Sequence, residues 1–366
     1  MSLRVLHIVD SLVPQADSVG AALPGLLRAL DGTDCSGMVT VLDGRTDVDA
    51  DFNNSRWTVE PWRRNATAEL VEGADVVHIH GLTGRGSTAI ARAAHKQGKP
   101  FILAPHGAFS SAVRSRRPLT RRVMGRFGDR ALLRSAAAVQ ALHTVEANEL
   151  RQCGPSRCIV QLPYSVDVAT DMVDAAPRSS TNGDSGRCLL MLGPIDPVEG
   201  VVGVLKSVAE IGKAGNDWRV VLAGAARGEW RAMLEAGVRR KGSEDRVEFG
   251  SAADWPAQRA WLQKASLLVA GSLRIRPAVS IMQAVATGVP VLATNCVVPD
   301  ELTEHVSVCE PTRAAIRMKL RETLELDEAT RRERAGAALA CFRSRLSWSE
   351  VAPKYAALYQ QVSAAT

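Results

Sequence analysis

The sequence predicts an α/β protein of two domains, each built on a parallel β-sheet. Short apolar runs of strand length alternate with helical patterns, which is typical of a parallel sheet covered by helices on both faces. A polar segment at 176–187, APRSSTNGDSGR, interrupts this alternation and has the composition of an interdomain linker. The chain of 366 residues, 46% apolar and 23% charged, is also long enough to bury two cores.

The first half of the chain contains six predicted strands. They are expected at 5–9, 38–42, 76–79, 101–104, 136–139 and 159–162, with the clearest helices at 21–30, 87–95 and 145–152. After the linker the rhythm restarts, with strands expected at 188–192, 220–223, 247–249, 267–270 and 289–292. The expected division is 1–170, a linker at 171–187, a second domain at 188–345 and a helical end at 346–366. Two such sheets in succession predict a ligand cleft beyond the carboxyl ends of their strands.

The composition excludes several classes of protein. No apolar run approaches the roughly 18 residues that cross a bilayer, and residues 3–9 have the pattern of a first strand rather than of a signal peptide. We therefore expect a cytoplasmic protein. The seven cysteines are scattered without a C-x-x-C pair, so neither a disulfide framework nor a zinc site is indicated by them.

A basic stretch at 114–134 accounts for the positive formal charge of the chain. From Arg114 to Arg134 it holds eight arginines against one aspartate, a net charge of +7. Leu119, Val123 and Phe127 recur every fourth residue, which is the pattern of a basic amphipathic helix that binds an anionic membrane surface or a lipid-diphosphate acceptor. That interpretation makes the protein peripheral at the inner face of the membrane; the alternative is a helix with one solvated face. Nucleic acid is not an expected partner, because aromatic residues make up only 4% of the chain.

Several short motifs follow one another in a characteristic order. VVHIHGL, PFILAPHGAF and LPYSVD lie in the first half, and WRVVLAG and VEFGS in the second. Two longer segments, CLLMLGPIDPVEG at 188–200 and ASLLVAGSLRIRPAVSIMQAVATGVPVLAT at 265–294, accompany them. Together they resemble the family 4 (group 1) retaining glycosyltransferases of the GT-B class, and the resemblance covers nearly the whole chain.

The resemblance implies both a fold and an activity. The fold is two Rossmann-like parallel-sheet domains facing a cleft, an acceptor domain first and a nucleotide-sugar domain second, with a C-terminal helix that returns to the N-terminal domain. The activity is transfer of a hexose, with retention, from a nucleoside-diphosphate sugar to a glycan or lipid-linked acceptor in surface polysaccharide or glycolipid assembly. It requires no metal and no cofactor besides the sugar nucleotide.

The sequence departs from the resembled family at six positions, which are Pro194, Glu199, Ile275, Gln283, Tyr164 and Ser165. The family carries an arginine and a lysine for the donor diphosphate where Pro194 and Glu199 stand, and glutamates where Ile275 and Gln283 stand. Two buried phosphates carry about two negative charges, which cations normally neutralise. The departures keep a second function open, that of a catalytically silent homologue that binds a partner transferase or a glycan.

Other residues of the same segments are candidates to bind the donor. Arg274 and Arg276 lie in the loop before a predicted helix, and the free N–H groups at its start, near Ala278 and Val279, attract anions. The alternative is that both arginines are solvated loop residues. Two further residues complete the candidate donor site: Gly193, and Gln283 through its amide oxygen.

His106 is the catalytic candidate. It follows an apolar strand and precedes Gly107 in a P-H-G turn at the expected cleft. In the resembled family the histidine of this turn lies near the reacting sugar or acceptor, where a neutral imidazole can bond a hydroxyl. The alternative is a histidine that fixes its own turn by bonding a backbone carbonyl.

The remaining candidates lie on the acceptor side. His78 and His80 point to the same face of one strand, but a metal ion would need a third ligand, and none is evident in the sequence. We expect His78 to pack in the sheet and His80, with Gly81, to line the cleft. Ser18 and Gly20 belong to the first strand-to-helix turn, where the resembled family has a glycine-rich loop; the alternative is an ordinary loop in which Ser18 caps the helix.

Overall fold

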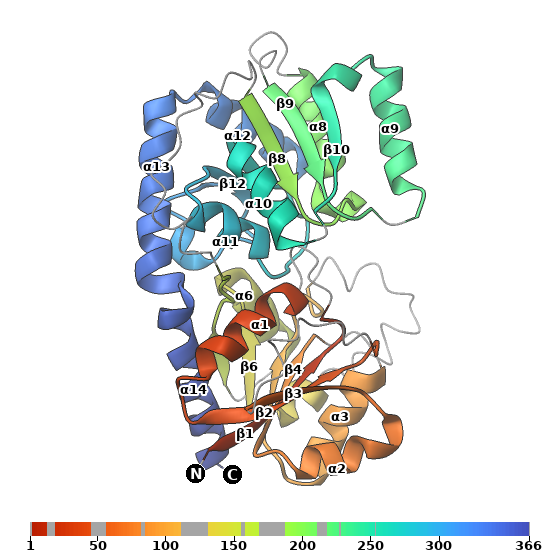
Figure 1. Cartoon of the computed structure of the whole chain (residues 1–366), viewed down its shortest axis with the longest axis vertical. Helices are drawn as coiled ribbons and strands as arrows, with labels where there is room; N and C mark the ends of the chain where they lie inside the picture. The colour runs from red at the N-terminus through yellow and green to blue at the C-terminus, as the bar shows by residue number, and fades with distance from the viewer. Residues whose placement is uncertain are drawn as a thin grey trace.

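The computed structural model describes residues 2–12, 19–44, 56–81, 85–110, 131–154, 158–167, 187–210, 218–226, 228–252 and 254–365. Ser18, most of the basic stretch 114–134 and nearly all of the expected linker 171–187 lie outside these residues. The described residues form two α/β domains, one above the other (Figure 1).

The N-terminal domain is built on a seven-stranded parallel sheet in the order β3-β2-β1-β4-β5-β6-β7. Its strands are β1 (Leu3–Val9), β2 (Cys35–Val41), β3 (Trp57–Pro61), β4 (Val76–His80), β5 (Phe101–Ala104), β6 (Ala138–Ala141) and β7 (Ile159–Gln161). Its helices include α1 (Val19–Leu30), α2 (Thr67–Glu72), α3 (Arg85–Lys96) and α6 (Thr144–Cys153), with a 3-10 turn at Arg64–Ala66. The central strand β1 alternates between two cores, because Val5 and Val9 join one hydrophobic cluster and Leu6 and Ile8 join another.

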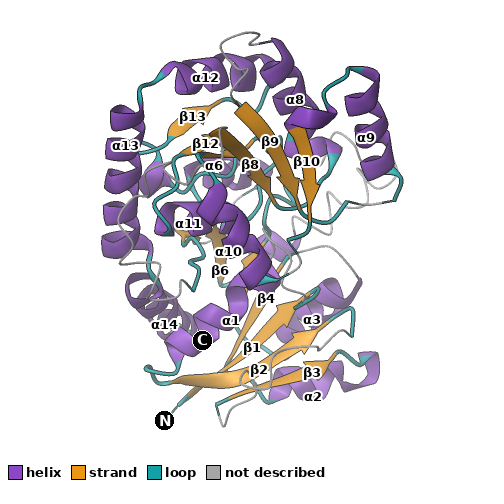
Figure 2. Cartoon of the chain, turned by 45° about the horizontal axis from the view of Figure 1, so that its top comes forward, coloured by secondary structure: helices purple, strands orange, loops and turns teal. Residues whose placement is uncertain are grey.

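The C-terminal domain has a six-stranded parallel sheet in the order β10-β9-β8-β11-β12-β13. Its strands are β8 (Arg187–Leu192), β9 (Trp218–Ala223), β10 (Val247–Gly250), β11 (Leu267–Ala270), β12 (Val291–Thr294) and β13 (Ser307–Cys309). Its helices include α8 (Val201–Glu210), α9 (Trp230–Arg240), α10 (Trp255–Lys264), α11 (Val279–Ala286) and α12 (Arg313–Glu325), with 3-10 turns at Pro197–Glu199, Glu244–Arg246 and Asp300–Leu302. In Figure 2, α10 and α11 lie between this sheet and the N-terminal domain.

The predicted fold class is confirmed, and the differences concern edges and boundaries. β6 and β12 begin two residues later than the apolar runs suggested. β3 and β13 were not predicted. Both are edge strands: β3 is mostly exposed, and β13 has only three residues. An edge strand with a solvated side needs no continuous apolar run, so neither strand has a recognisable sequence pattern.

Two consecutive helices at the C-terminus join the domains. α13 (Glu328–Cys341) packs on α11, and a π-helical turn at Phe342–Leu346 leads into α14 (Trp348–Ala364). α14 then lies against α1, β1 and β4 of the N-terminal domain (Figure 1). Its buried Tyr355 and Tyr359 bond side chains of the N-terminal sheet. The C-terminal helix therefore returns to the first domain, as the family resemblance implied.

Candidate functional site

A row of glycines forms the edge of the C-terminal sheet at the carboxyl ends of its strands. β8, β9 and β11 are followed directly by Gly193, Gly224 and Gly271. A Cβ atom on Gly224 would lie 1.8 Å from the Gly193 carbonyl oxygen, and one on Gly200, whose φ is +74°, would lie 2.1 Å from the Gly271 carbonyl oxygen. These contacts exclude side chains, so a ligand at this edge meets main-chain groups.

Glu199 lies beside the glycine edge at the end of the turn Pro197–Glu199. Asp196 caps this turn by accepting a 2.9 Å hydrogen bond from a backbone N–H. The Glu199 side chain is only 4% exposed, and its carboxylate contacts two arginines. Its Oε1 is 3.3 Å from Nη2 of Arg274, and its Oε2 is 2.7 Å from Nε of Arg276.

The pairing of Glu199 with two arginines lowers the positive charge that Arg274 and Arg276 would otherwise give the site. Arg276 lines the same cavity as Gly193, and Arg274 joins it through Glu199. Both arginines are ion-paired with Glu199, the acidic side chain that stands in a cation position of the resembled family. Two guanidinium groups against one carboxylate leave a net charge of +1. Arg274 is 42% exposed and Arg276 13%, so Arg274 is the more accessible cation. Below them a cavity of about 20 Å³, lined in part by Pro194 and Gly193, has room for about one water molecule.

The start of α11 is close to this cluster in sequence, but Gln283 faces elsewhere. Ala278 is the N-terminal cap residue and makes no side-chain cap bond, and Val279 is buried. Gln283 is 5% exposed, and its Nε2 donates a 2.7 Å hydrogen bond to Oε1 of Gln258 on α10. The Gln283 amide oxygen is buried without a hydrogen-bond partner among the described residues.

The turn that carries His106 is strained and clamped. His106 has a left-handed φ of 50°, which costs a non-glycine residue about 1–2 kcal/mol and is concentrated at functional sites. Glu146 on α6 holds the turn, because its Oε1 accepts the Gly107 N–H at 2.7 Å and its Oε2 accepts the Leu142 N–H at 2.9 Å. Burial raises the pKa of Glu146 to about 7, although these two backbone hydrogen bonds oppose the shift.

The same turn touches the C-terminal domain. A Cβ atom on Gly107, whose φ is +78°, would lie 2.3 Å from the carbonyl oxygen of Ile275. Ile275, in a glutamate position of the resembled family, is thus 4% exposed and packed on the turn. Burial lowers the pKa of His106 to about 3, so its imidazole is neutral at physiological pH. Its Nδ1 has no hydrogen-bond partner among the described residues.

A hydrogen-bonded chain links His106 to the core of the N-terminal sheet. The Tyr164 hydroxyl lies 3.2 Å from Nε2 of His106 and 2.6 Å from Nδ1 of His80. His80 Nε2 lies 2.9 Å from Nδ1 of His7, and His78 Nδ1 lies 2.9 Å from the Tyr359 hydroxyl. Tyr164, a departure from the resembled family, therefore holds the catalytic candidate in place.

Of the acceptor-side candidates, His80 and Gly20 are buried, and Gly81 directly follows the end of β4. His80 is 3% exposed and bonded at both ring nitrogens, so it reaches the His106 turn only through Tyr164. Gly81 has a φ of 90°, and its N–H donates to the Ala104 carbonyl at 2.7 Å. Gly20 is buried in the first turn of α1, where a Cβ atom would lie 2.6 Å from the Ser11 carbonyl oxygen, so close packing explains this glycine.

Polar contacts at the start of α6 hold the two domains together. The Nε2 of His143 lies 3.0 Å from the Cys296 carbonyl oxygen. Asp300 Oδ2 accepts hydrogen bonds from the backbone N–H and the hydroxyl of Thr144, at 2.8 and 2.7 Å. These bonds cap α6, the helix that carries Glu146, with groups from the C-terminal domain.

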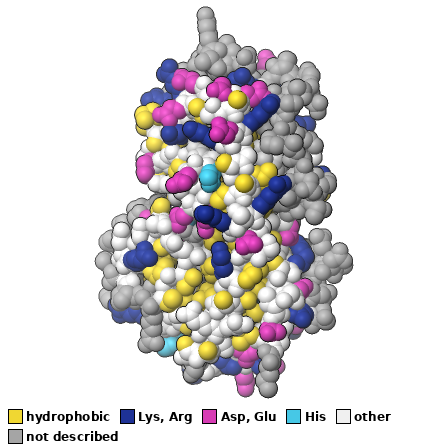
Figure 3. All heavy atoms as spheres, turned by 90° about the vertical axis from the view of Figure 1, so that its left-hand side faces the viewer, with side chains coloured by type: hydrophobic (Ala, Val, Ile, Leu, Met, Phe, Trp, Pro, Cys, Tyr) yellow, Lys and Arg dark blue, Asp and Glu magenta, His cyan; other side chains and the backbone are white. Residues whose placement is uncertain are grey.

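Two observations on the described residues concern membrane binding. None of the described helices combines the length and apolarity that a membrane span requires. On the face formed by α13 and α14, acidic and basic side chains are mixed in the upper part and apolar side chains gather in the lower part (Figure 3). Of the basic stretch, only residues 131–134 are described.

Sequence reasoning missed three features of the site. It did not identify His7, although the two-residue alternation of β1 puts it on the same face as Val5 and Val9, toward α14. It did not identify Glu146 as the clamp of the His106 turn, for which no local signal exists. It treated Glu199 only as a missing cation, because the pairing of Glu199 with Arg274 joins residues 75 positions apart.

Comparison with known families gives matches to both halves of the chain. Residues 7–164 match the glycosyl transferase 4-like domain, and residues 173–338 match the glycosyl transferases group 1 family. Among curated proteins, the chain is 23% identical over 244 residues to a GDP-mannose:cellobiosyl-diphosphopolyprenol alpha-mannosyltransferase from Xanthomonas oryzae pv. oryzae (strain PXO99A). That alignment covers 66% of this chain and 60% of the relative's length.

Solved structures share the fold at low sequence identity. Sucrose-phosphate synthase from Thermosynechococcus elongatus superimposes with a TM-score of 0.76 at 16% identity, covering 100% of both chains. HepE of Anabaena, in complex with UDP and glucose, superimposes with a TM-score of 0.73 at 16% identity, covering 98% of this chain and 99% of its own.

Proposed function

The chain belongs to the group 1 glycosyltransferases, and on this premise we propose that it transfers a hexose from a nucleoside-diphosphate sugar to a glycan or lipid-linked acceptor. The transfer retains the anomeric configuration, uses no metal at the donor site and contributes to surface polysaccharide or glycolipid assembly. Two relatives support the substrate classes. HepE was solved with UDP and glucose, and the mannosyltransferase is named for GDP-mannose and a diphosphopolyprenol.

The observation that carries this proposal is the cluster of Glu199, Arg274 and Arg276 beside the glycine edge. A leaving diphosphate develops negative charge, and preorganised cations and helix N-terminal N–H groups stabilise it without a metal. The Glu199 carboxylate pairs with both guanidinium groups, and the proposal assigns these same groups to the donor diphosphate. When the nucleotide binds, phosphate oxygens replace the Glu199 carboxylate as acceptors for the two guanidinium groups. Arg274, which is 42% exposed, is the first to exchange the carboxylate for a phosphate.

His106 faces the reacting sugar or its acceptor in this proposal. Its imidazole is neutral, its Nδ1 has no partner among the described residues, and Ile275 of the other domain packs on its turn. A neutral imidazole can accept or donate one hydrogen bond to a sugar hydroxyl. The strain of the left-handed backbone is retained because Glu146 and Tyr164 hold the turn and the ring.

A second candidate function is that of a silent homologue that binds a partner transferase or a glycan. The observation that favours it is the burial of Glu199, whose side chain is 4% exposed and already neutralises part of the charge that a diphosphate needs. A nucleotide that enters this site must displace a buried ion pair, and buried pairs are costly to separate.

Binding of nucleoside diphosphates decides between the two functions. We would titrate UDP, GDP, ADP and CDP into wild type, Arg276→Ala and Glu199→Gln and follow thermal stability. A ligand at about 100 times its Kd adds about 2.7 kcal/mol of stability. The matched control is Glu235→Gln, which removes the carboxylate of an exposed ion pair with Arg231 on α9, at 2.9 Å.

A transferase binds one of the four diphosphates and releases it from the corresponding sugar nucleotide. Arg276→Ala weakens that binding, Glu199→Gln strengthens it, and Glu235→Gln leaves it unchanged. Absence of binding to both wild type and Glu199→Gln supports the silent homologue. Tight binding that is indifferent to Arg276→Ala and Glu199→Gln contradicts this assignment of the site while leaving the transferase function intact.

A further inference from the structure

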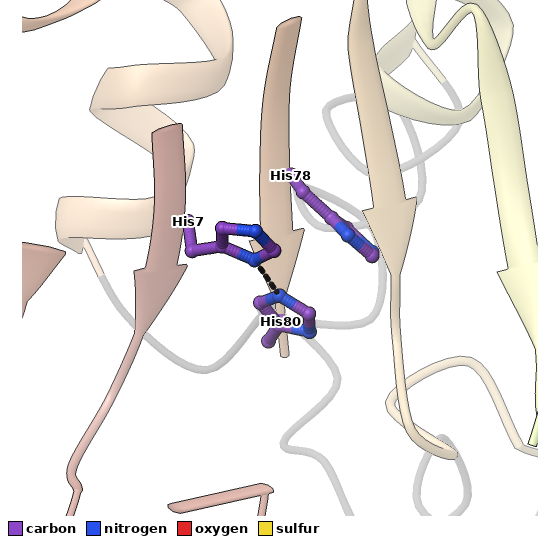
Figure 4. A group of neighbouring side chains, drawn as sticks. All are labelled: His7, His78 and His80. Atoms are coloured by element: carbon purple, nitrogen blue, oxygen red, sulfur yellow. Dashed lines mark hydrogen bonds between the residues drawn. The ribbon is translucent and has the colours of Figure 1, made fainter. Parts of the chain in front are cut away.

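Three histidines of the N-terminal domain face one another from two neighbouring strands. The parallel register of β1 and β4 pairs His7 with His78, and His80 lies two residues further along the same face. All three side chains are buried, at 0%, 0% and 3% exposure. One ring nitrogen of each lies within 4.8 Å of the others (Figure 4). The sequence shows only the H-x-H pair of β4; the sheet adds the third imidazole.

The outer nitrogens of two of these rings are already fixed by tyrosines. His78 Nδ1 bonds the Tyr359 hydroxyl at 2.9 Å, and His80 Nδ1 bonds the Tyr164 hydroxyl at 2.6 Å. Metal-binding histidines commonly donate their second N–H to such a partner, which fixes the tautomer with a lone pair on the other nitrogen. When both rings donate from Nδ1 to the tyrosine hydroxyls, their lone pairs are on Nε2.

The ring nitrogens that face one another inside the cluster can act as metal ligands. His78 Nε2 is buried and has no hydrogen-bond partner among the described residues, and a buried nitrogen of this kind is destabilising unless a ligand satisfies it. His80 Nε2 is held 2.9 Å from Nδ1 of His7.

The spacing is close to that of a tetrahedral centre. A zinc ion about 2.0–2.1 Å from each nitrogen sets the ligand nitrogens about 3.3 Å apart and the ring centres about 5 Å apart. The ring centres of His7 are 5.2 Å from His80 and 5.6 Å from His78. Those of His78 and His80 are 3.9 Å apart and must separate by about 1 Å.

We propose that His7, His78 and His80 bind one divalent transition-metal ion, with zinc the best match, in the interior of the N-terminal domain. Three imidazoles are typical zinc ligands, and a water molecule completes the tetrahedron. The three ligands come from β1 and β4, and their hydrogen-bond partners are Tyr359 on α14 and Tyr164. The bound ion therefore stabilises the N-terminal domain and the packing of α14 on it. This inference is independent of the proposed transfer reaction.

Metal binding to the wild-type protein is the first test. After removal of bound metals with a chelator, the protein should take up one Co²⁺ per chain with the visible absorption of a tetrahedral nitrogen site, and Zn²⁺ should displace it. Zn²⁺ should also raise the melting temperature. In ¹⁵N-labelled wild type, the signals of three histidine rings should shift on zinc addition, those of His78 and His80 at Nε2.

A conservative pair of variants tests the tyrosine contacts. Tyr359→Phe removes the hydroxyl bonded to His78 and should weaken zinc binding about 10–100-fold, as loss of such a partner typically does. Tyr355→Phe is the matched control, because the Tyr355 hydroxyl lies on the same helix but bonds Gln140 and the Pro163 carbonyl. His78→Gln should abolish binding, and His95→Gln, which changes an exposed histidine of α3, should not.

Two results would overturn the proposal. One is metal-free wild type that takes up no Co²⁺ or Zn²⁺ and melts at the same temperature with and without zinc. The other is uptake in which the ring signals of His7, His78 and His80 do not move, since the ion would then be bound elsewhere. Both readouts use wild type, so they hold even where a histidine variant fails to fold.

Discussion

The Glu199 carboxylate lies 2.7 Å from the guanidinium Nε of Arg276, at a position where the resembled family carries a cation. Both side chains are largely buried, at 4% and 13% exposure. The acidic side chain at this position is therefore paired with arginines of the loop before α11.

Glu199→Gln should destabilise the protein while improving its affinity for nucleoside diphosphates. The amide keeps the size of the side chain but leaves two guanidinium groups without their carboxylate, which should lower the free energy of unfolding by about 1–3 kcal/mol. Chemical denaturation measures this, with Glu235→Gln as the exposed control. A variant as stable as wild type would show that the ion pair does not hold the site together.

Gly107→Ala should separate steric contact from backbone strain at the domain interface. Gly98 has a similar φ, +66°, but open space around its Cβ position, whereas the Cβ of residue 107 would lie 2.3 Å from the Ile275 carbonyl oxygen. Gly98→Ala should cost only the left-handed backbone term, about 1 kcal/mol, and Gly107→Ala about 1–3 kcal/mol more. Equal losses of stability in denaturant would contradict the contact between Gly107 and Ile275.

Glu146 should make stability depend on pH between about 4.5 and 7. Burial raises its pKa in the folded protein from 4.5 to about 7, so the folded state binds the proton more tightly than the unfolded state does. The stabilisation is complete below pH 4.5 and is lost as the pH rises toward 7, by up to about 3 kcal/mol. The free energy of unfolding of wild type minus that of Glu146→Gln should therefore fall over this range and then level off. A difference that is flat, or that rises with pH, would show that the two backbone hydrogen bonds outweigh burial.

Asp300→Ala should loosen the contact between the domains. Asp300 accepts two hydrogen bonds from Thr144 at the start of α6, and their loss should cost about 1 kcal/mol. Asp327 is the matched control, because it accepts the same pair of bonds from Thr330 within α13. Calorimetry should resolve separate melting of the two domains in Asp300→Ala and a single transition in Asp327→Ala. Identical traces would mean that the Asp300 contact does not couple the domains.

Local patterns in the sequence were enough to predict the fold class and most of the strands and helices. Apolar runs of strand length and helical periodicity are local properties, so strands such as β5 and β11 were predicted at their observed bounds. The order of motifs indicated the family, and reading residues one by one showed that the usual cations of the donor site are absent. Edge strands such as β3 gave no signal, because a strand with a solvated side needs no apolar run.

Contacts between side chains that are distant in sequence could not be predicted and depend on the three-dimensional packing. His7 and His80 are 73 positions apart in sequence and bond because β1 and β4 are neighbours in the sheet. Glu199 and Arg274 meet because β8 and β11 pair in parallel and end at the same edge. Spacing along the chain fixes the face on which a side chain lies, but strand order and register fix its partners, and these arise from packing of the whole chain.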